Sequence, residues 1–226
     1  MDKVRVRLIL LVAVLSVILG SLIGGVAAKY IWSTEFSGKV TFSAKLAESI
    51  VLLESEAIKS NDGSYTLNTA KPVSENSYTL LPGLDIPKDP YITVHRKTPI
   101  AAYLYVEVVE SKDYREGILQ YSLDDRWKKL DIAGKNGGQV YVYMNEGKTA
   151  PLAISNDPED FTVNILKGQT LTVSQELKSA LSSNALTFYG LMAEAAQDSA
   201  ISGTVGTFDH SANVYTALVN SGTTTP

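Results

Sequence analysis

Along most of the chain, apolar residues alternate with polar ones at a period of two, which is typical of β-strands rather than of helices. The longest such run covers residues 29–46, where Tyr30, Trp32 and Phe36 share one parity. Gly38 is a position at which this long ribbon can bend. The same pattern predicts shorter strands at 49–54, 64–67, 77–81, 91–95, 101–109, 139–144, 161–166, 170–173 and 185–193.

Turn residues separate these segments. The sequences at 61–63 (Asn-Asp-Gly) and 136–138 (Asn-Gly-Gly) can supply the positive φ angles of tight hairpins, and Pro82-Gly83 closes another turn. Segment 101–109 is apolar on both parities, which predicts a central strand covered on both faces.

Helical signals are few, and short helical turns are expected only at 158–160 and 175–182. About ten short strands with frequent turns predict an all-β fold, a jelly-roll-like β-sandwich. The last segment, 201–226, is rich in Gly, Ser and Thr, and we expect a loosely attached tail or pairing segment there, with a short strand at 213–219.

The first 28 residues have the composition of a signal peptide. Residues 1–7 carry three basic side chains, 8–23 are mostly apolar, and Val26-Ala27-Ala28 provides a cleavage site before Lys29. The alternative is an uncleaved anchor, because 8–28 approaches the ~20 residues that span a bilayer. Glycines in this segment favour removal, so we expect a signal peptidase to cut between Ala28 and Lys29, with membrane contact only through the uncleaved leader.

Composition narrows the classes of function. The 226 residues are 45% hydrophobic and 19% charged, as in a folded globular chain. Loss of the leader removes three basic residues and one acidic residue, so the net charge falls from −4 to −6, and nucleic acid is not an expected partner. With no cysteine, the chain has no disulfide, thiolate metal site or thiol nucleophile.

Candidate catalytic chemistry is sparse, and we predict neither catalytic nor metal-ligating residues. His95 stands beside Arg96 and Lys97, whose charges disfavour a metal ion, and His210 lies in the last segment. No Gly-x-Ser-x-Gly elbow occurs. No cofactor is expected, although calcium at aspartate-rich loops stays open as an alternative for 124–125, 156–160 and the pair Asp85 and Asp89.

Tyrosine is unusually common, with 12 residues against 5 Phe and 2 Trp. Tyr103, Tyr105, Tyr141 and Tyr143 alternate along predicted strands. They are either exposed aromatic ladders that form a contact surface or ordinary strand residues.

Cleavage of the leader would leave an aromatic strand at a free end of the chain. Burying its three aromatic side chains contributes roughly 5 to 9 kcal/mol beyond the backbone ladder. The strand folds either into its own sheet or into a groove of the next copy, and the second arrangement makes a head-to-tail filament. The predicted polymerisation interface of this donor strand comprises Tyr30, Ile31, Trp32, Thr34 and Phe36.

Several motifs occur in a familiar order. They are Ala27-Ala28-Lys29-Tyr30-Ile31-Trp32-Ser33, then the strand 40–46, then 78–85 leading to 91–94, and the closing 188–197. Across residues 20–198 the sequence resembles the TasA/camelysin family of exported matrix-fibre proteins. The resemblance implies a jelly-roll subunit that donates its N-terminal strand to a neighbour in biofilm fibres, as in related archaeal bundling pili. Leu84 between Gly83 and Asp85 departs from the family's direct Pro-Gly-Asp turn.

The sequence therefore predicts a leader at 1–28, a donor strand at 29–38, a β-sandwich domain at 39–200 and a C-terminal segment at 201–226. The leading hypothesis is a secreted, non-enzymatic structural protein that polymerises with identical subunits into extracellular fibres or pili. A camelysin-like secreted metalloendopeptidase and a monomeric cell-surface binding module are the alternatives.

Overall fold

The computed structural model describes residues 25–27, 50–95, 101–111, 114, 116–148, 150–151, 160–176, 186–195 and 201–221. Within these ranges the chain is built of antiparallel strands with a single α-helix near its end. The all-β class that the period-two pattern predicts is therefore confirmed. None of the helices in the described ranges is long and apolar enough to cross a membrane.

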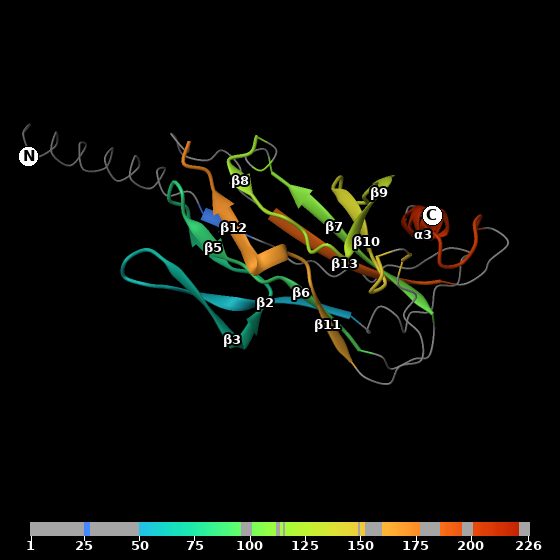
Figure 1. Cartoon of the computed structure of the whole chain (residues 1–226), viewed down its shortest axis with the longest axis horizontal. Coiled ribbons are helices and arrows are strands. Elements are labelled where there is room, and N and C mark those ends of the chain that lie inside the picture. The colour runs from blue at the N-terminus through green and yellow to red at the C-terminus, as the bar shows by residue number, and fades with distance from the viewer. Residues whose placement is uncertain are drawn as a thin grey trace, which may run out of the picture.

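Two four-stranded sheets form the body of the molecule (Figure 1). The first has the order β13-β7-β10-β9, and the second has the order β11-β6-β2-β3. Their bounds are Leu186–Glu194 (β13), Ala102–Glu110 (β7), Gln139–Tyr143 (β10), Trp127–Ala133 (β9), Phe161–Asn164 (β11), Tyr91–Val94 (β6), Ile50–Lys59 (β2) and Tyr65–Val73 (β3).

Two small sheets close one end of the body. One pairs β5 (Asp85–Pro87), β12 (Thr170–Val173) and β8 (Leu119–Gln120), with a 3-10 turn η2 (Lys167–Gln169) before β12. The other pairs β1 (Gly25–Ala27) with β4 (Ser77–Thr79), and β1 is the short blue strand in Figure 1.

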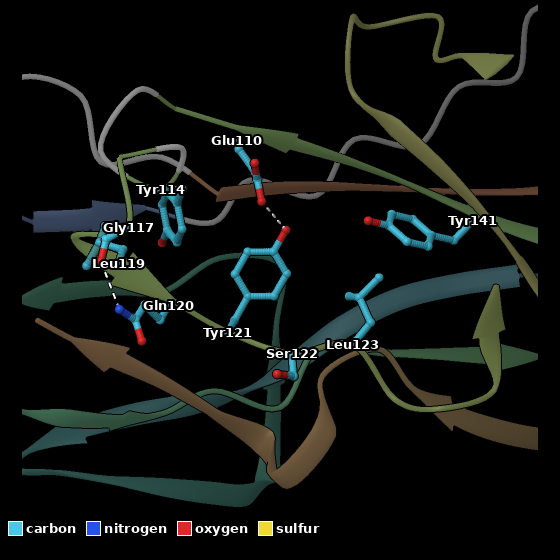
Figure 2. Close-up of a pocket in the computed structure, with 9 residues that line it drawn as sticks. All are labelled: Glu110, Tyr114, Gly117, Leu119, Gln120, Tyr121, Ser122, Leu123 and Tyr141. Carbon is cyan, nitrogen blue, oxygen red and sulfur yellow. Dashed lines mark hydrogen bonds between the residues drawn. The ribbon is translucent and has the colours of Figure 1, made fainter. Parts of the chain in front are cut away.

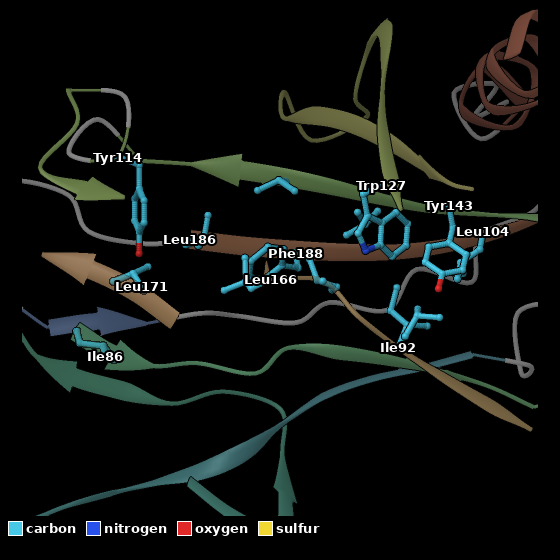
Figure 3. Packing of buried hydrophobic residues seen from close by; sticks show 14 of the residues in the cluster. Ile86, Ile92, Leu104, Tyr114, Trp127, Tyr143, Leu166, Leu171, Leu186 and Phe188 are labelled. Carbon is cyan, nitrogen blue, oxygen red and sulfur yellow. The ribbon is translucent and has the colours of Figure 1, made fainter. Parts of the chain in front are cut away.

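Apolar side chains from both large sheets meet in one core, as expected of a β-sandwich. Leu104, Val106 and Phe188 of the first sheet and Ile50 and Ile92 of the second are all buried in this core. Figure 3 shows Phe188 reaching into the space between the layers. A side chain at Gly190 would meet those of Ile50 and Ile92, so the two sheets approach closely there.

A second core lies on the opposite face of the first sheet, under helix α3 (Phe208–Ser221). Tyr103 and Tyr105 of β7 are fully buried and pack with Val214 and Tyr215 of α3. Since Leu104 and Val106 face the first core, β7 is covered on both faces. The prediction of a central strand at 101–109 is confirmed.

Helix α3 corrects two expectations from the sequence. Residues 213–219 belong to the helix rather than to a strand, and the described part of the segment, 201–221, is docked rather than loose, since the Tyr105 hydroxyl donates to the carbonyl of Ser211 at 2.8 Å. An exposed ladder of Tyr103, Tyr105 and Tyr143 is also wrong, because these side chains are buried. Tyr141 is partly buried against the first core.

The hairpin predictions are confirmed at the glycines. Gly63 between β2 and β3 has φ +88°, and Gly137 between β9 and β10 has φ +78°. Gly83 also has a positive φ of +74° in its turn. Strands β1, β5, β8 and β9 were not predicted. The expected helical turns at 158–160 and 175–182 fall mostly outside the described residues.

Candidate functional site

The predicted donor-strand residues, Tyr30, Ile31, Trp32, Thr34 and Phe36, and the cleavage positions Ala28 and Lys29 lie outside the described part of the chain. The residues immediately before them are described. Gly25–Ala27 forms β1, which pairs antiparallel with β4 in the register Gly25 to Thr79, Val26 to Tyr78 and Ala27 to Ser77. The segment just ahead of the predicted cut is thus paired to a strand of the body.

Strand β4 is fixed to the body through its buried tyrosine. Tyr78 is 2% exposed, donates its hydroxyl to the carbonyl of Pro87 at 3.2 Å and meets the ring of Tyr65 edge to face at 5.1 Å. The Thr79 backbone N–H donates to the Tyr65 hydroxyl at 2.6 Å. Because β1 is the one strand with which β4 pairs among the described elements, removal of β1 would leave an open sheet edge.

A cleft of about 600 Å³ lies near the end of β7, beside β8 (Figure 2). Figure 2 shows Tyr121 standing in this cleft, with Tyr114 and Tyr141 to either side and Glu110 above its hydroxyl. The Tyr121 hydroxyl donates to Glu110 Oε1 at 2.5 Å, and the rings of Tyr114 and Tyr121 meet edge to face at 6.0 Å.

Burial and the neighbouring Glu110 carboxylate both disfavour ionisation of these phenols. Burial, then the Glu110 hydrogen bond and charge, raise the pKa of Tyr121 far above its usual value, and burial followed by the Glu110 charge raises the pKa of Tyr141. The hydroxyls therefore stay protonated at neutral pH. The cleft offers aromatic faces and one carboxylate, which suit stacking and polar contacts with a ligand.

The two histidines have different surroundings. At the surface, His95 Nδ1 lies 2.6 Å from Asp160 Oδ2. His95 therefore has a carboxylate neighbour in addition to Arg96 and Lys97, which follow it in the sequence. His210 is fully buried, with its Nδ1 3.0 Å from the Tyr103 hydroxyl. Within the described ranges, no group of three or more His, Cys, Asp or Glu side chains is placed to hold a metal ion.

The described candidate calcium carboxylates make other contacts. Asp125 faces Lys167 at 2.9 Å and Lys148 at 3.5 Å, while Asp85 accepts the Thr172 hydroxyl at 2.7 Å. Asp89 accepts the backbone N–H and the hydroxyl of Ser55. Residues 156–159 are not among those described. Calcium binding stays an untested alternative.

Comparison of the sequence with models of known protein families, with curated proteins and with solved structures gave no match.

Sequence reasoning missed the cleft and the pairing of β4. Tyr121 was not singled out, because the short strand beside it, β8, contains only two residues and shows no period. The β1 pairing was missed because 25–27 is too small and apolar to distinguish a strand from the end of a leader. The count of 12 tyrosines was the available signal for the cleft.

Proposed function

We propose that this chain is the precursor of an exported structural subunit that polymerises head to tail into extracellular fibres. In this proposal a signal peptidase cuts between Ala28 and Lys29, and the strand at 29–38 of each copy enters the sheet of the next. The body, a β-sandwich with the strand connections of a jelly roll, has a structural role and no catalytic one. Identical subunits are its partners.

The pairing of β1 with β4 is the observation that carries this proposal. Because β1 precedes the predicted cut, cleavage would remove it from β4 and leave the edge of Ser77–Thr79 that β1 covers facing solvent. An open edge of this kind attracts an extended segment from another chain. The ribbon that begins at Lys29 has the apolar parity needed to fill it.

The proposal also predicts when assembly begins. While the leader is attached, β1 occupies the edge that a donor strand needs, so the precursor is protected from premature polymerisation. A chain whose cleavage site is blocked by Ala28→Pro is therefore expected to remain monomeric in size-exclusion chromatography. Fibres formed by the uncut precursor would contradict the role given to β1.

The interface is tested by changing one face of the ribbon. The double variant Trp32→Asp/Phe36→Asp places charges on the face that is to be buried, and we expect no fibres in electron micrographs while the circular dichroism of the body is unchanged. Ser33→Asp/Ser37→Asp puts the same charges on the opposite parity and should still polymerise. Fibres of normal length from the first variant would refute the proposal.

A further inference from the structure

Lys88 and Glu54 form an ion pair inside the protein, with side chains that are both 0% exposed and Nζ 2.7 Å from Oε2. Glu54 belongs to β2, and Lys88 directly follows β5, so the pair connects two different sheets. The second carboxylate oxygen, Oε1, is buried and accepts no hydrogen bond from any described residue. A buried ion pair with an unsatisfied oxygen is costly, because the desolvation of both charges is only partly offset.

The groups around the pair are themselves held in place. The ring of Tyr78 lies 5.4 Å from Lys88 Nζ. Asp89, the next residue, is 6% exposed and is held by the Ser55 N–H at 2.9 Å and the Ser55 hydroxyl at 2.6 Å. The Asn76 side chain is bound to β2, the strand that carries Glu54. Its Oδ1 accepts the Ala57 N–H at 2.8 Å, and its Nδ2 donates to the Ser55 carbonyl at 2.7 Å.

Such a setting favours neutral groups over charged ones. Burial lowers the pKa of the Lys88 amine, although the charges of Glu54 and Asp89 act in the opposite direction. Transfer of one proton along the 2.7 Å hydrogen bond converts the ion pair into an amine and a carboxylic acid. The amine is then a nucleophile, and the carboxylic acid is its electrophile.

We propose that Lys88 and Glu54 join in an intramolecular isopeptide bond. Because Oε2 is bonded to Cδ, the amine nitrogen lies within about 4 Å of the carbon that it attacks, close to the separation of reacting groups held in place. The Nζ–Cδ bond forms, one Cδ–O bond breaks, and the leaving hydroxyl takes the second amine proton and departs as water. Asp89, the adjacent residue whose charge acts on the Lys88 amine, is the carboxylate that we assign to carry this proton.

The bond would act as a covalent staple in a chain with no cysteine. It would tie β2 to the segment after β5, directly beneath the ring of Tyr78 in β4. The amide also removes both buried charges. The inference does not depend on fibre formation, since the bond forms within one subunit.

Peptide mapping by mass spectrometry of the purified, secreted protein tests the bond. Trypsin cuts after Lys45 and Lys59, is blocked at Lys71 by Pro72, and does not cut at an acylated Lys88. We expect peptides 46–59 and 60–96 as one species, about 18 Da lighter than their sum, with fragment ions that place the link at Glu54. Separate peptides 46–59, 60–88 and 89–96 would overturn the proposal.

Three further outcomes sharpen the assignment. A loss of about 17 Da confined to peptide 60–96 would make Asn76 the acceptor and would overturn the role of Glu54. Lys88→Arg keeps the charge but removes the nucleophile, so we expect the link to disappear. Lys71→Arg changes the exposed pair with Glu56 and should leave the link intact. The unsubstituted protein decides the question even where a variant fails to fold.

Discussion

Glu107 gives the clearest prediction of stability, because one buried carboxylate holds the first sheet, a hairpin turn and the C-terminal helix together. It is 3% exposed in β7 and accepts the Asn136 N–H at 2.8 Å, the Asn136 side-chain N–H at 3.0 Å and the Gly138 N–H at 2.9 Å. The Tyr215 hydroxyl of α3 donates to it at 3.3 Å. The variant Glu107→Ala removes all four acceptor contacts.

The size of the loss in the free energy of unfolding depends on which hydrogen-bond donors can bind water once the Glu107 carboxylate is removed. The turn at Asn136 is exposed, so its groups are rehydrated after truncation, whereas Gly138 N–H and the Tyr215 hydroxyl are less accessible. Hydrogen bonds to charged groups contribute about 1.5 to 3 kcal/mol each, so two uncompensated bonds give a loss of about 3 to 6 kcal/mol in the free energy of unfolding.

Urea unfolding followed by tryptophan fluorescence measures this loss. With a slope of about 2 to 3 kcal/mol per M, the midpoint should fall by at least ~1 M while the slope is unchanged. Glu110→Ala is the matched control, because Glu110 lies on the same strand and accepts the Tyr121 hydroxyl at the edge of the cleft. A loss below about 1 kcal/mol for Glu107→Ala would refute the reasoning.

Three other predictions concern the core, a turn and a surface charge. Phe188→Ala empties a fully buried site between the sheets and should cost about 3 to 5 kcal/mol in thermal or urea unfolding, and a loss under ~1 kcal/mol would contradict the packing. Gly138→Ala places a Cβ 2.5 Å from the Val108 carbonyl oxygen and should cost about 1 to 3 kcal/mol; an unchanged midpoint would show that the turn moves freely. The hydrogen bond from Lys167 lowers the pKa of Asp125 below 3.8, so the pair stabilises the fold above that pH and less as pH falls through the lowered pKa. NMR titration of the Asp125 carboxyl should give this lowered pKa, and the pKa should rise in the Lys167→Met variant. An Asp125 pKa that does not rise in this variant would contradict the prediction.

The alternation of apolar and polar residues predicts most of the large sheets, because their strands are long enough to show a period of two. Segment 101–109 even indicates its central position, since Tyr103 and Leu104 point to two different cores. Strands β5 and β8 have three and two residues, which is too short for any period to be recognised. Their places are set by pairing with β12, which is a tertiary effect.

Helix α3 was missed for a different reason. The small and β-branched residues of 208–221 have weak helix propensity, and a Ser- and Thr-rich composition is more typical of a tail. The helix is stabilised by its contact with Tyr103 and Tyr105. Partners of this contact lie 107 and 106 positions apart in the sequence, so local residue spacing cannot predict it. The ion pair of Lys88 with Glu54 escaped notice for the same reason, since 34 positions separate its two residues.

The most direct test of the proposed assembly is an electron cryo-microscopy map of the fibres formed by the cleaved protein. The account predicts that residues 30–36 of each subunit form a strand hydrogen-bonded to Ser77–Thr79 of the neighbouring subunit, in the place of β1. A map in which this segment pairs with its own subunit, with β4 making no contact to another copy, would contradict it.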